Sequence, residues 1–133
     1  MGNKYIKLLI LLVVLIGGGT AYQKYYRPTG SSGCKTVGPT KEFRMVSKEN
    51  KWYFDPAEIR VKKCDHVVIH IFNEDVYDHG FAIDVFGVNR RLNPKRETTV
   101  DFTPSISGDF PFYCSVACGE GHYRHTGMVI VEE

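Results

Sequence analysis

The segment that decides the fold is "HVVIHIFN", residues 66–73. Side chains two residues apart along a β-strand point to the same face of a sheet. The segment has two such sets: Val67, Ile69 and Ile71 form one, and Val68, His70 and Phe72 form the other. A strand with one fully aliphatic face must bury that face against a second layer. The segment therefore predicts a strand of a β-sandwich.

Short runs of the same kind fill the chain beyond residue 40. They are rich in β-branched and aromatic residues, are separated by turn-forming residues, and show no long stretch of helical period. About seven strands at this spacing predict an all-β fold, an antiparallel Greek-key sandwich. The other candidate strands are "EFRMVS" (42–47), "EIRVKK" (58–63), "GFAIDVFGV" (80–88), "TTVDFT" (98–103), "DFPFYC" (109–114) and "GMVIVEE" (127–133).

The amino terminus has a different character. Residues 5–22 are almost continuously apolar, with only Lys7 as an interruption, and about 17 to 25 such residues are needed to cross a bilayer as a helix. Because Lys4 and Lys7 lie at its start, the positive-inside tendency places the N-terminus in the cytoplasm, although two basic residues after the run weaken this bias. We therefore predict a transmembrane helix within residues 1–23.

A cleaved signal peptide is the alternative for this segment. Gly19, Thr20 and Ala21 are small residues of the kind found at cleavage sites. The apolar run is at the upper edge of the length of a signal peptide's hydrophobic region, so we favour an uncleaved anchor. Both interpretations export the rest of the chain. We expect a single-pass protein of the cell membrane whose C-terminal domain lies on the periplasmic or extracellular side.

Residues 24–40 predict a linker. Proline, glycine, serine and threonine crowd residues 27–40, which is the composition of a tether. This leaves residues 41–133 as one domain, a size that suits a single core. The 133-residue chain has a formal charge of +2, with basic and acidic residues interspersed. It has no block of like charge, so we expect no nucleic-acid partner.

The four cysteines form two different pairs. An exported chain meets an oxidising compartment, so disulfides are the ordinary expectation. A bridge between Cys34 and Cys64 would pin the linker to the domain, but sequence alone does not place their Cα atoms within bridging range. Cys114 and Cys118 are only four residues apart, so a bridge there would gain the least from loop closure. With His122 beside them, they favour a soft-metal site.

The segment "CSVACGEGHYRHTGMVIV" (114–131) resembles the C-x3-C-G-x-G-H-x2-M-x-G loop of the binuclear copper A (CuA) cupredoxins. That family includes subunit II of cytochrome c oxidases and a domain of nitrous oxide reductase. "EDVYDHGFAIDVFGVN" (74–89) resembles its D-V-x-H-G-F segment, and "FDPAEIRVKKCDHVVIHI" (54–71) resembles its early strands. The resemblance covers residues 41–133 and implies a cupredoxin-like Greek-key sandwich. Residues 80–88 are also similar to nitrosocyanin, a cupredoxin with a mononuclear red copper centre.

The resemblance implies a set of metal ligands in this chain. Cys114 and Cys118 would bridge two copper ions, and His79 and His122 would each bind one of them. The backbone carbonyl of Val116 would be a weak axial ligand. Thiolates and imidazoles are soft and borderline ligands that hold copper, so this implied set suits the metal.

The family's other axial ligand is a methionine three residues after the histidine, and that position is His125 here. Imidazole is a stronger and harder donor than a thioether, so we expect His125 to favour the oxidised centre and lower its potential. It could also favour one copper over two. Met128 falls where the family begins its last strand. We interpret it as a strand residue, with an alternate axial ligand as the other possibility.

Several nearby residues also have plainer interpretations. His79 could be an ordinary strand-end histidine and His125 a surface-loop histidine, but their places in the motifs favour metal binding. Asp75 and Asp78 either orient the second nitrogen of His79 or are solvated turn carboxylates. We assign structural or solvated roles to His66, His70 and Glu120, and core positions to Trp52, Tyr53 and Phe54.

The predicted function is a membrane-tethered copper protein that carries single electrons through a CuA-like pair of copper ions. The resemblance implies a subunit II-like component of a haem-copper oxidase. Its partners would be a redox donor such as cytochrome c and an acceptor such as an oxidase core subunit. No acid–base pair indicates an active site of its own, so no catalytic residue is assigned and enzymatic activity would belong to the oxidase as a whole.

Other functions stay open at this point. One is a mononuclear Cys/His copper protein of the nitrosocyanin type, with one copper ion. Another is a copper-delivery or assembly protein, although no βαβ alternation indicates the thioredoxin-like fold of some copper chaperones. Zinc held by two cysteines and two histidines is a further possibility.

Overall fold

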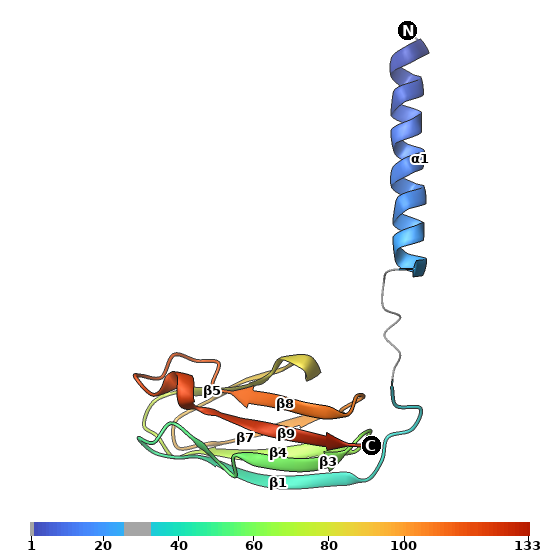
Figure 1. The fold of residues 1–133 in the computed structure, drawn as a ribbon. Helices are drawn as coiled ribbons and strands as arrows, with labels where there is room; N and C mark the ends of the chain where they lie inside the picture. Colours follow the sequence, from blue (N-terminus) through green and yellow to red (C-terminus); the bar gives the residue numbers. More distant parts are fainter. Residues whose placement is uncertain (1, 26–32) are drawn as a thin grey trace. The chain divides into compact units, whose positions relative to one another are not determined.

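The computed structural model describes residues 2–25 and 33–133, which belong to two separate compact units (Figure 1). The first unit is an N-terminal helix and the second is a β-sandwich. Of the predicted linker, residues 26–32 lie outside the described residues, and residues 33–39 lead directly into the first strand.

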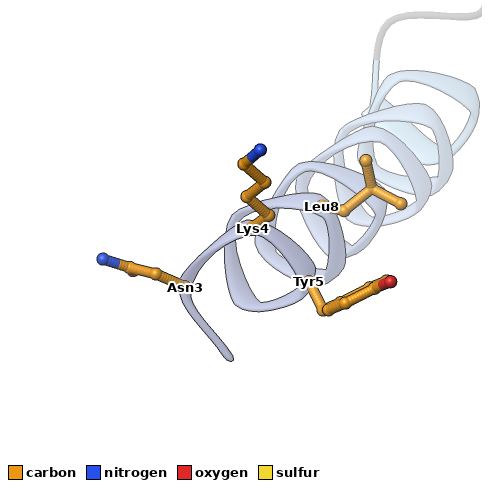
Figure 2. Close-up of a pocket in the computed structure, with 4 residues that line it drawn as sticks. All are labelled: Asn3, Lys4, Tyr5 and Leu8. Carbon is orange, nitrogen blue, oxygen red and sulfur yellow. The ribbon is translucent and has the colours of Figure 1, made fainter. Parts of the chain in front are cut away.

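The first unit is helix α1 (Gly2–Tyr25). Its segment Asn3–Tyr22 is long and apolar enough to cross a membrane. A signal sequence near an N-terminus has the same length and composition, so the helix alone does not separate the two predicted alternatives. Figure 2 shows a pocket on its first turns, lined by Asn3, Lys4, Tyr5 and Leu8. These four residues belong to one helix, so the pocket is a surface hollow outside the sandwich.

The second unit consists of two packed sheets. The four-stranded sheet has the order β2 (Phe54–Asp55), β1 (Thr40–Ser47), β4 (His66–Asn73) and β7 (Glu97–Phe102). The five-stranded sheet has the order β3 (Glu58–Lys62), β9 (Thr126–Glu132), β8 (Gly108–Tyr113), β5 (His79–Ile83) and β6 (Val88–Leu92). Two short 3-10 helices, η1 (Asp84–Phe86) and η2 (His122–Arg124), lie in connections. The predicted all-β sandwich behind one apolar helix is confirmed.

Strand β4 has the predicted alternation. Val67, Ile69 and Ile71 are fully buried, whereas Val68 and His70 between them are partly exposed. The buried set belongs to one core cluster with Phe81 and Phe112 of the other sheet. Phe54 of β2 packs edge to face on both of these rings, with centroids 5.5 Å apart. The core therefore lies between the two sheets, as the pattern of β4 predicts.

Two details of the predicted strands are wrong. The sandwich is not purely antiparallel, because β1 runs parallel to β4 and β3 runs parallel to β9. Neither pair is consecutive in the chain, so each is joined through strands of both sheets and no hairpin forces it to be antiparallel. In addition, "GFAIDVFGV" is two strands, since η1 and the left-handed Gly87 (φ 66°) turn the chain between β5 and β6.

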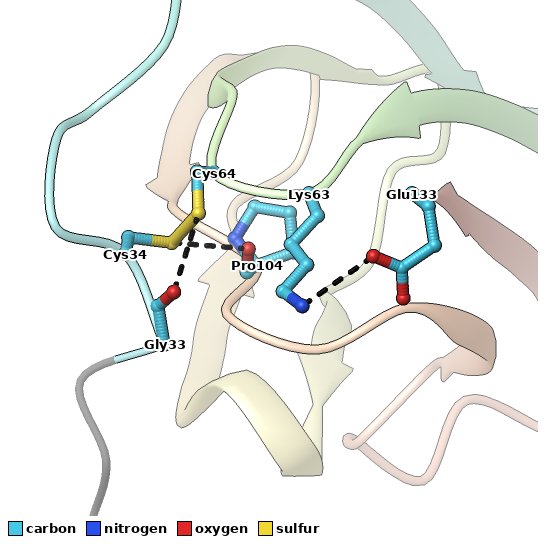
Figure 3. Close-up of a disulfide and its surroundings, with 6 residues drawn as sticks. All are labelled: Gly33, Cys34, Lys63, Cys64, Pro104 and Glu133. Carbon is cyan, nitrogen blue, oxygen red and sulfur yellow. Dashed lines mark hydrogen bonds and ion pairs between the residues drawn. A yellow bond between two sulfur atoms is a disulfide. The ribbon is translucent and has the colours of Figure 1, made fainter.

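Cys34 and Cys64 form a disulfide, which answers a question that the sequence leaves open (Figure 3). Backbone hydrogen bonds hold the same region: Cys64 N–H donates to Pro104 O at 2.8 Å, and Gly38 N–H donates to Cys64 O at 2.7 Å. Lys63 beside it pairs with Glu133 at 3.5 Å. The disulfide therefore fastens the segment before β1 to the end of the sandwich that also holds the C-terminus.

Replacing both Cys34 and Cys64 with serine should lower the free energy of unfolding of the sandwich by about 3 to 4 kcal/mol, because the bridge closes a loop of about 30 residues in the unfolded chain. Denaturant titration followed by the fluorescence of Trp52, the one tryptophan of the sequence, measures this. Wild-type protein under reducing conditions is the control and should lose a similar amount. An unchanged midpoint in both samples would contradict the predicted stabilisation.

Candidate metal centre

Chemistry-bearing residues gather at the end of the sandwich away from the disulfide. His79 begins β5, Cys114 follows β8, and Cys118, His122 and His125 lie in the connection between β8 and β9. Figure 1 shows this connection beside β5 and at the opposite end from the C-terminus. Because β5 and β8 are hydrogen-bonded neighbours in one sheet, residues far apart in the sequence meet at the same end of these two strands.

Four of the predicted ligands form a compact buried group, which we call the quartet: His79, Cys114, Cys118 and His125. One potential ligand atom from each lies within 4.8 Å of all the others. The two Sγ atoms are 3.5 Å apart, His79 Nδ1 is 3.7 Å from Cys114 Sγ, and His125 Nδ1 is 4.0 Å from Cys118 Sγ. Both histidines are fully buried, so His125 is not a surface-loop histidine.

The other two predicted ligands flank the quartet. His122 Nδ1 is 3.5 Å from Cys118 Sγ, but His122 is not a member of the mutually close group and its side chain is half-buried. The carbonyl oxygen of Val116 is 3.1 Å from Cys114 Sγ. Met128 lies in β9, opposite Glu58 of β3, as expected for a strand residue.

A buried carboxylate orients His79. Asp75 Oδ2 accepts a hydrogen bond from His79 Nε2 at 2.6 Å, and Asp75 Oδ1 accepts one from Asn50 N–H at 3.0 Å. Asp75 is 1% exposed and is held in place by Asn73, whose Oδ1 accepts its N–H at 2.9 Å. The bond fixes the proton on Nε2 and leaves Nδ1 facing sulfur. Asp78, the other candidate, pairs instead with Arg91 at the surface.

His125 is held from three sides. Ser47 Oγ, at the end of β1, is 3.3 Å from His125 Nε2. The ring of Phe54 packs against the imidazole with centroids 4.1 Å apart, and His79 meets it edge-on at 4.8 Å. These contacts turn Nδ1 of His125 toward Cys118. Ser47 is not among the predicted site residues, because nothing in "EFRMVS" marks its last residue as a partner of a distant histidine.

Trp52 supports the ligand loop, a role that was not predicted from the sequence. Its Nε1–H donates to the carbonyl oxygen of Cys118 at 3.1 Å. The indole ring lies against Gly119 and Gly121, and a Cβ atom at Gly121 would overlap it. The two glycines of the loop were a signal that a large side chain could pack there. Of the two aromatic residues that follow Trp52, Phe54 is a core residue as predicted, but Tyr53 is exposed, so its predicted core position is wrong.

Gly80 allows the loop to approach β5. Its N–H donates to Cys114 Sγ at 3.3 Å. A Cβ atom at this position would collide with Ser115 Oγ and would lie 2.8 Å from the backbone nitrogen of Ser115. A residue larger than glycine here would therefore push Cys114 away from His79.

The environment separates the acidities of the two thiols. Burial acts to raise the pKa of Cys114, but the contacts of its sulfur with the side chains of His125 and His79 and with Gly80 N–H outweigh it and lower the pKa to about 4. Burial and the neighbouring Cys114 raise the pKa of Cys118 to about 12. The thiol pair therefore releases one proton readily and holds the second, unless a cation replaces it.

The donors fit a soft or borderline metal ion. Four ligands bound at about 2.0 to 2.3 Å around one ion stand roughly 3.3 to 3.8 Å apart. Three of the separations in the quartet, 3.5, 3.7 and 4.0 Å, are close to these values, and all of them are within 4.8 Å. Two thiols and two imidazoles are ligands of copper and zinc, not of magnesium or calcium, which prefer oxygen.

Comparison with known proteins gives the same assignment. A family model described as a cupredoxin-like domain matches residues 26–131. The chain belongs to this family. Within it, the donor set described above makes the sandwich a cupredoxin with a copper-type site.

This cupredoxin is similar in sequence to subunit 2 of a cytochrome c oxidase from Thermus thermophilus, with 30% identity over 80 residues that cover 60% of this chain and 58% of the relative. It is also similar to a nitrous-oxide reductase from Cupriavidus necator, with 34% identity over 82 residues that cover 59% of this chain but 13% of the relative. The chain thus spans about half the length of the oxidase subunits it matches, and much less of the reductases.

Solved structures share the fold. The periplasmic domain of subunit II of cytochrome oxidase (CoxB) of Bradyrhizobium japonicum aligns with a TM-score of 0.60 and 21% identity, over 69% of this chain and 83% of that chain. A chain of a heme-copper terminal oxidase dimer aligns with a TM-score of 0.59 and 23% identity, over 98% of each chain. At these identities the alignments support the cupredoxin fold alone.

Asp75→Asn should weaken copper binding about 10- to 100-fold, because the change removes the negative charge that orients and polarises His79. Competition with a chelator of known affinity measures the effect. Asp78→Asn is the matched control and should leave the affinity unchanged, since Asp78 pairs with Arg91 at the surface. Equal effects of the two substitutions would contradict the role of Asp75.

Proposed function

We propose that this cupredoxin carries single electrons through a binuclear CuA-type copper centre. The observation that supports it most is the pair of buried sulfur atoms 3.5 Å apart, with His79 and His125 in the quartet and His122 approaching Cys118 from outside it. A single closed site needs four ligands, and the two thiolates and two imidazoles of the quartet already supply them. The third imidazole, that of His122, is therefore a ligand for a second ion.

The proposed ligands have distinct roles. Cys114 and Cys118 would be shared by both ions, His79 and His125 would bind one ion, and His122 with the Val116 carbonyl would bind the other. When bound, a copper pair supplies a one-electron site whose change of charge is spread over two metals and two sulfurs.

The chain itself keeps the ligands still during such a change. Cys114 N–H donates to His125 O at 2.9 Å, and His125 N–H donates to His122 O at 3.1 Å, so the ligand residues are tied to one another through the backbone. The indole of Trp52 holds the Cys118 carbonyl, and Asp75 holds His79. A rigid set of ligands changes little in geometry when an electron arrives or leaves, and this favours fast transfer.

The relatives suggest where the electrons go. Because the matched proteins include subunit 2 of a cytochrome c oxidase, we propose that this chain is a subunit II-like component of a haem-copper oxidase. It would accept electrons from a donor such as cytochrome c and pass them to an oxidase core subunit. It would act as part of that enzyme and not as an enzyme alone.

The proposed organisation follows the predicted one. Residues 1–23 anchor the protein in the cell membrane, residues 24–40 are the linker, and residues 41–133 form the cupredoxin domain on the periplasmic or extracellular side. The apolar helix and the similarity to oxidase subunit 2 support this arrangement. The disulfide of Cys34 and Cys64 is consistent with an oxidising compartment.

Copper content and electron paramagnetic resonance test the proposal. The copper-loaded chain should be purple, hold two copper ions, and give a seven-line or strongly delocalised mixed-valence signal. Cys118→Ser should abolish this signal, because one of the two shared sulfurs is lost. His70→Ala, a change on the outer face of β4, is the control and should leave the signal intact. A four-line signal with one copper ion for each wild-type chain would contradict the binuclear proposal.

That contradictory result would instead support the second candidate function, a mononuclear Cys/His copper protein of the nitrosocyanin type. The observation in its favour is His125, whose fully buried imidazole completes a four-ligand site without His122. The copper count therefore separates the two functions directly.

His125→Met should raise the reduction potential of the copper-loaded protein. A thioether is a softer and weaker donor than imidazole, so it stabilises the reduced state relative to the oxidised one. A change of about 1.4 kcal/mol in this balance corresponds to about 60 mV for one electron. Protein-film voltammetry measures the shift, with His70→Ala as the control. A potential that stays the same or falls would mean that His125 is not a ligand.

A further inference from the structure

We infer that the two metal positions are unequal, and that the quartet of His79, Cys114, Cys118 and His125 retains one soft divalent ion when His122 is removed. The inference rests on the proposed function, because it concerns the same centre. It adds which of the two positions binds metal first. It also adds which ions that position accepts, because a site with all four ligands for one ion can hold Zn²⁺ or Co²⁺ as well as copper.

The quartet already has nearly the size of a site for one ion. Its ligand atoms lie within 4.8 Å of one another, and the closest separations are 3.5 and 3.7 Å. Ligands at the corners of a tetrahedron around one ion are separated by roughly 3.3 to 3.8 Å. Binding the first ion therefore requires the four side chains to move by no more than about an ångström.

The imidazoles of the quartet are held in place before any ion binds. His79 is fixed by the buried carboxylate of Asp75, and His125 is fixed by Ser47 Oγ and the ring of Phe54. Both histidines are 0% exposed. Ligands that are already oriented lose little side-chain freedom on binding, so the quartet should bind its ion tightly.

His122 lacks comparable support. Its side chain is half-buried and lies on the short η2 helix. Apart from Cys118, the described neighbour of its ring is Tyr123, which is 91% exposed. Ordering an imidazole that is attached to a surface turn costs more side-chain entropy than using one that is already fixed.

The charges also favour unequal positions. Two thiolates neutralise one divalent ion, and the buried carboxylate of Asp75 adds negative charge behind His79, a ligand of the quartet. A second ion must share the same two sulfur atoms and meets the repulsion of the first ion, with little screening in a buried site. The first ion should therefore bind in the quartet and the second should bind more weakly beside His122.

The test is a titration of the full-length chain, metal-free and with both free thiols reduced, with Co²⁺ alone under anaerobic conditions. Thiolate-to-cobalt charge transfer and intense d–d bands report four-coordinate binding. Wild type and His122→Ala should each bind one equivalent, with affinities within about threefold of each other. His125→Ala should lose at least about 10- to 100-fold in affinity. His70→Ala is the control on a histidine outside the site.

Copper uptake by the same variants completes the test. Wild type should take up two copper ions and His122→Ala one. If His122→Ala binds neither cobalt nor copper while wild type holds two coppers, the inference is wrong and the proposed function stands. If wild type holds one copper and His122→Ala also holds one, the binuclear function is wrong and the quartet stands.

Folding is checked separately from metal binding. His125 is fully buried, so circular dichroism and a thermal melt accompany His125→Ala, and His125→Gln provides a second variant with less loss of volume. His122 is half-buried, and its replacement leaves the core intact. A folded His122→Ala protein without a cobalt spectrum would overturn the inference regardless of how the His125 variants behave.

Discussion

Two thiols held 3.5 Å apart in a buried loop set the main physical constraint on this protein. If both are ionised, their charges repel each other, and burial strengthens the repulsion because little solvent screens it. Because of this repulsion only one thiol ionises readily: the pKa is lowered to about 4 for Cys114 and raised to about 12 for Cys118. A soft cation that replaces the protons removes the repulsion. The loop is thus most favourable when it holds metal.

The rest of the site end keeps this loop in position. Gly80 and the β5–β8 pairing bring Cys114 against His79, and the indole of Trp52 supports the Cys118 carbonyl. Asp75 contacts Nε2 of His79, and Ser47 contacts Nε2 of His125. In both histidines, Nδ1 therefore faces sulfur. The two sheets supply the stiffness on which these contacts depend, and the disulfide fastens the opposite end. The positions of the candidate ligands therefore depend on the packing of the whole sandwich.

Much of this arrangement is visible in the sequence, but not its supporting contacts. The alternation in "HVVIHIFN" was sufficient to predict a sandwich strand, and the resemblance to the CuA ligand loop was needed to select the full set of candidate ligands. The parallel pairing of β1 with β4 and the break at Gly87 were missed, because pairing partners and turn geometry depend on the whole fold. The partners Ser47 and Trp52 were missed for a related reason, since they are 78 and 66 residues away from His125 and Cys118.

The central claim is that Cys114 and Cys118 share two copper ions. X-ray absorption at the copper edge of the loaded, full-length chain tests it most directly, because it reports the atoms around the average copper. The account predicts two sulfur neighbours per copper, three imidazole nitrogens shared between two coppers (about 1.5 for each), and a copper–copper scattering path. A spectrum with no copper–copper path, and with two or more imidazole nitrogens for each copper, would contradict it.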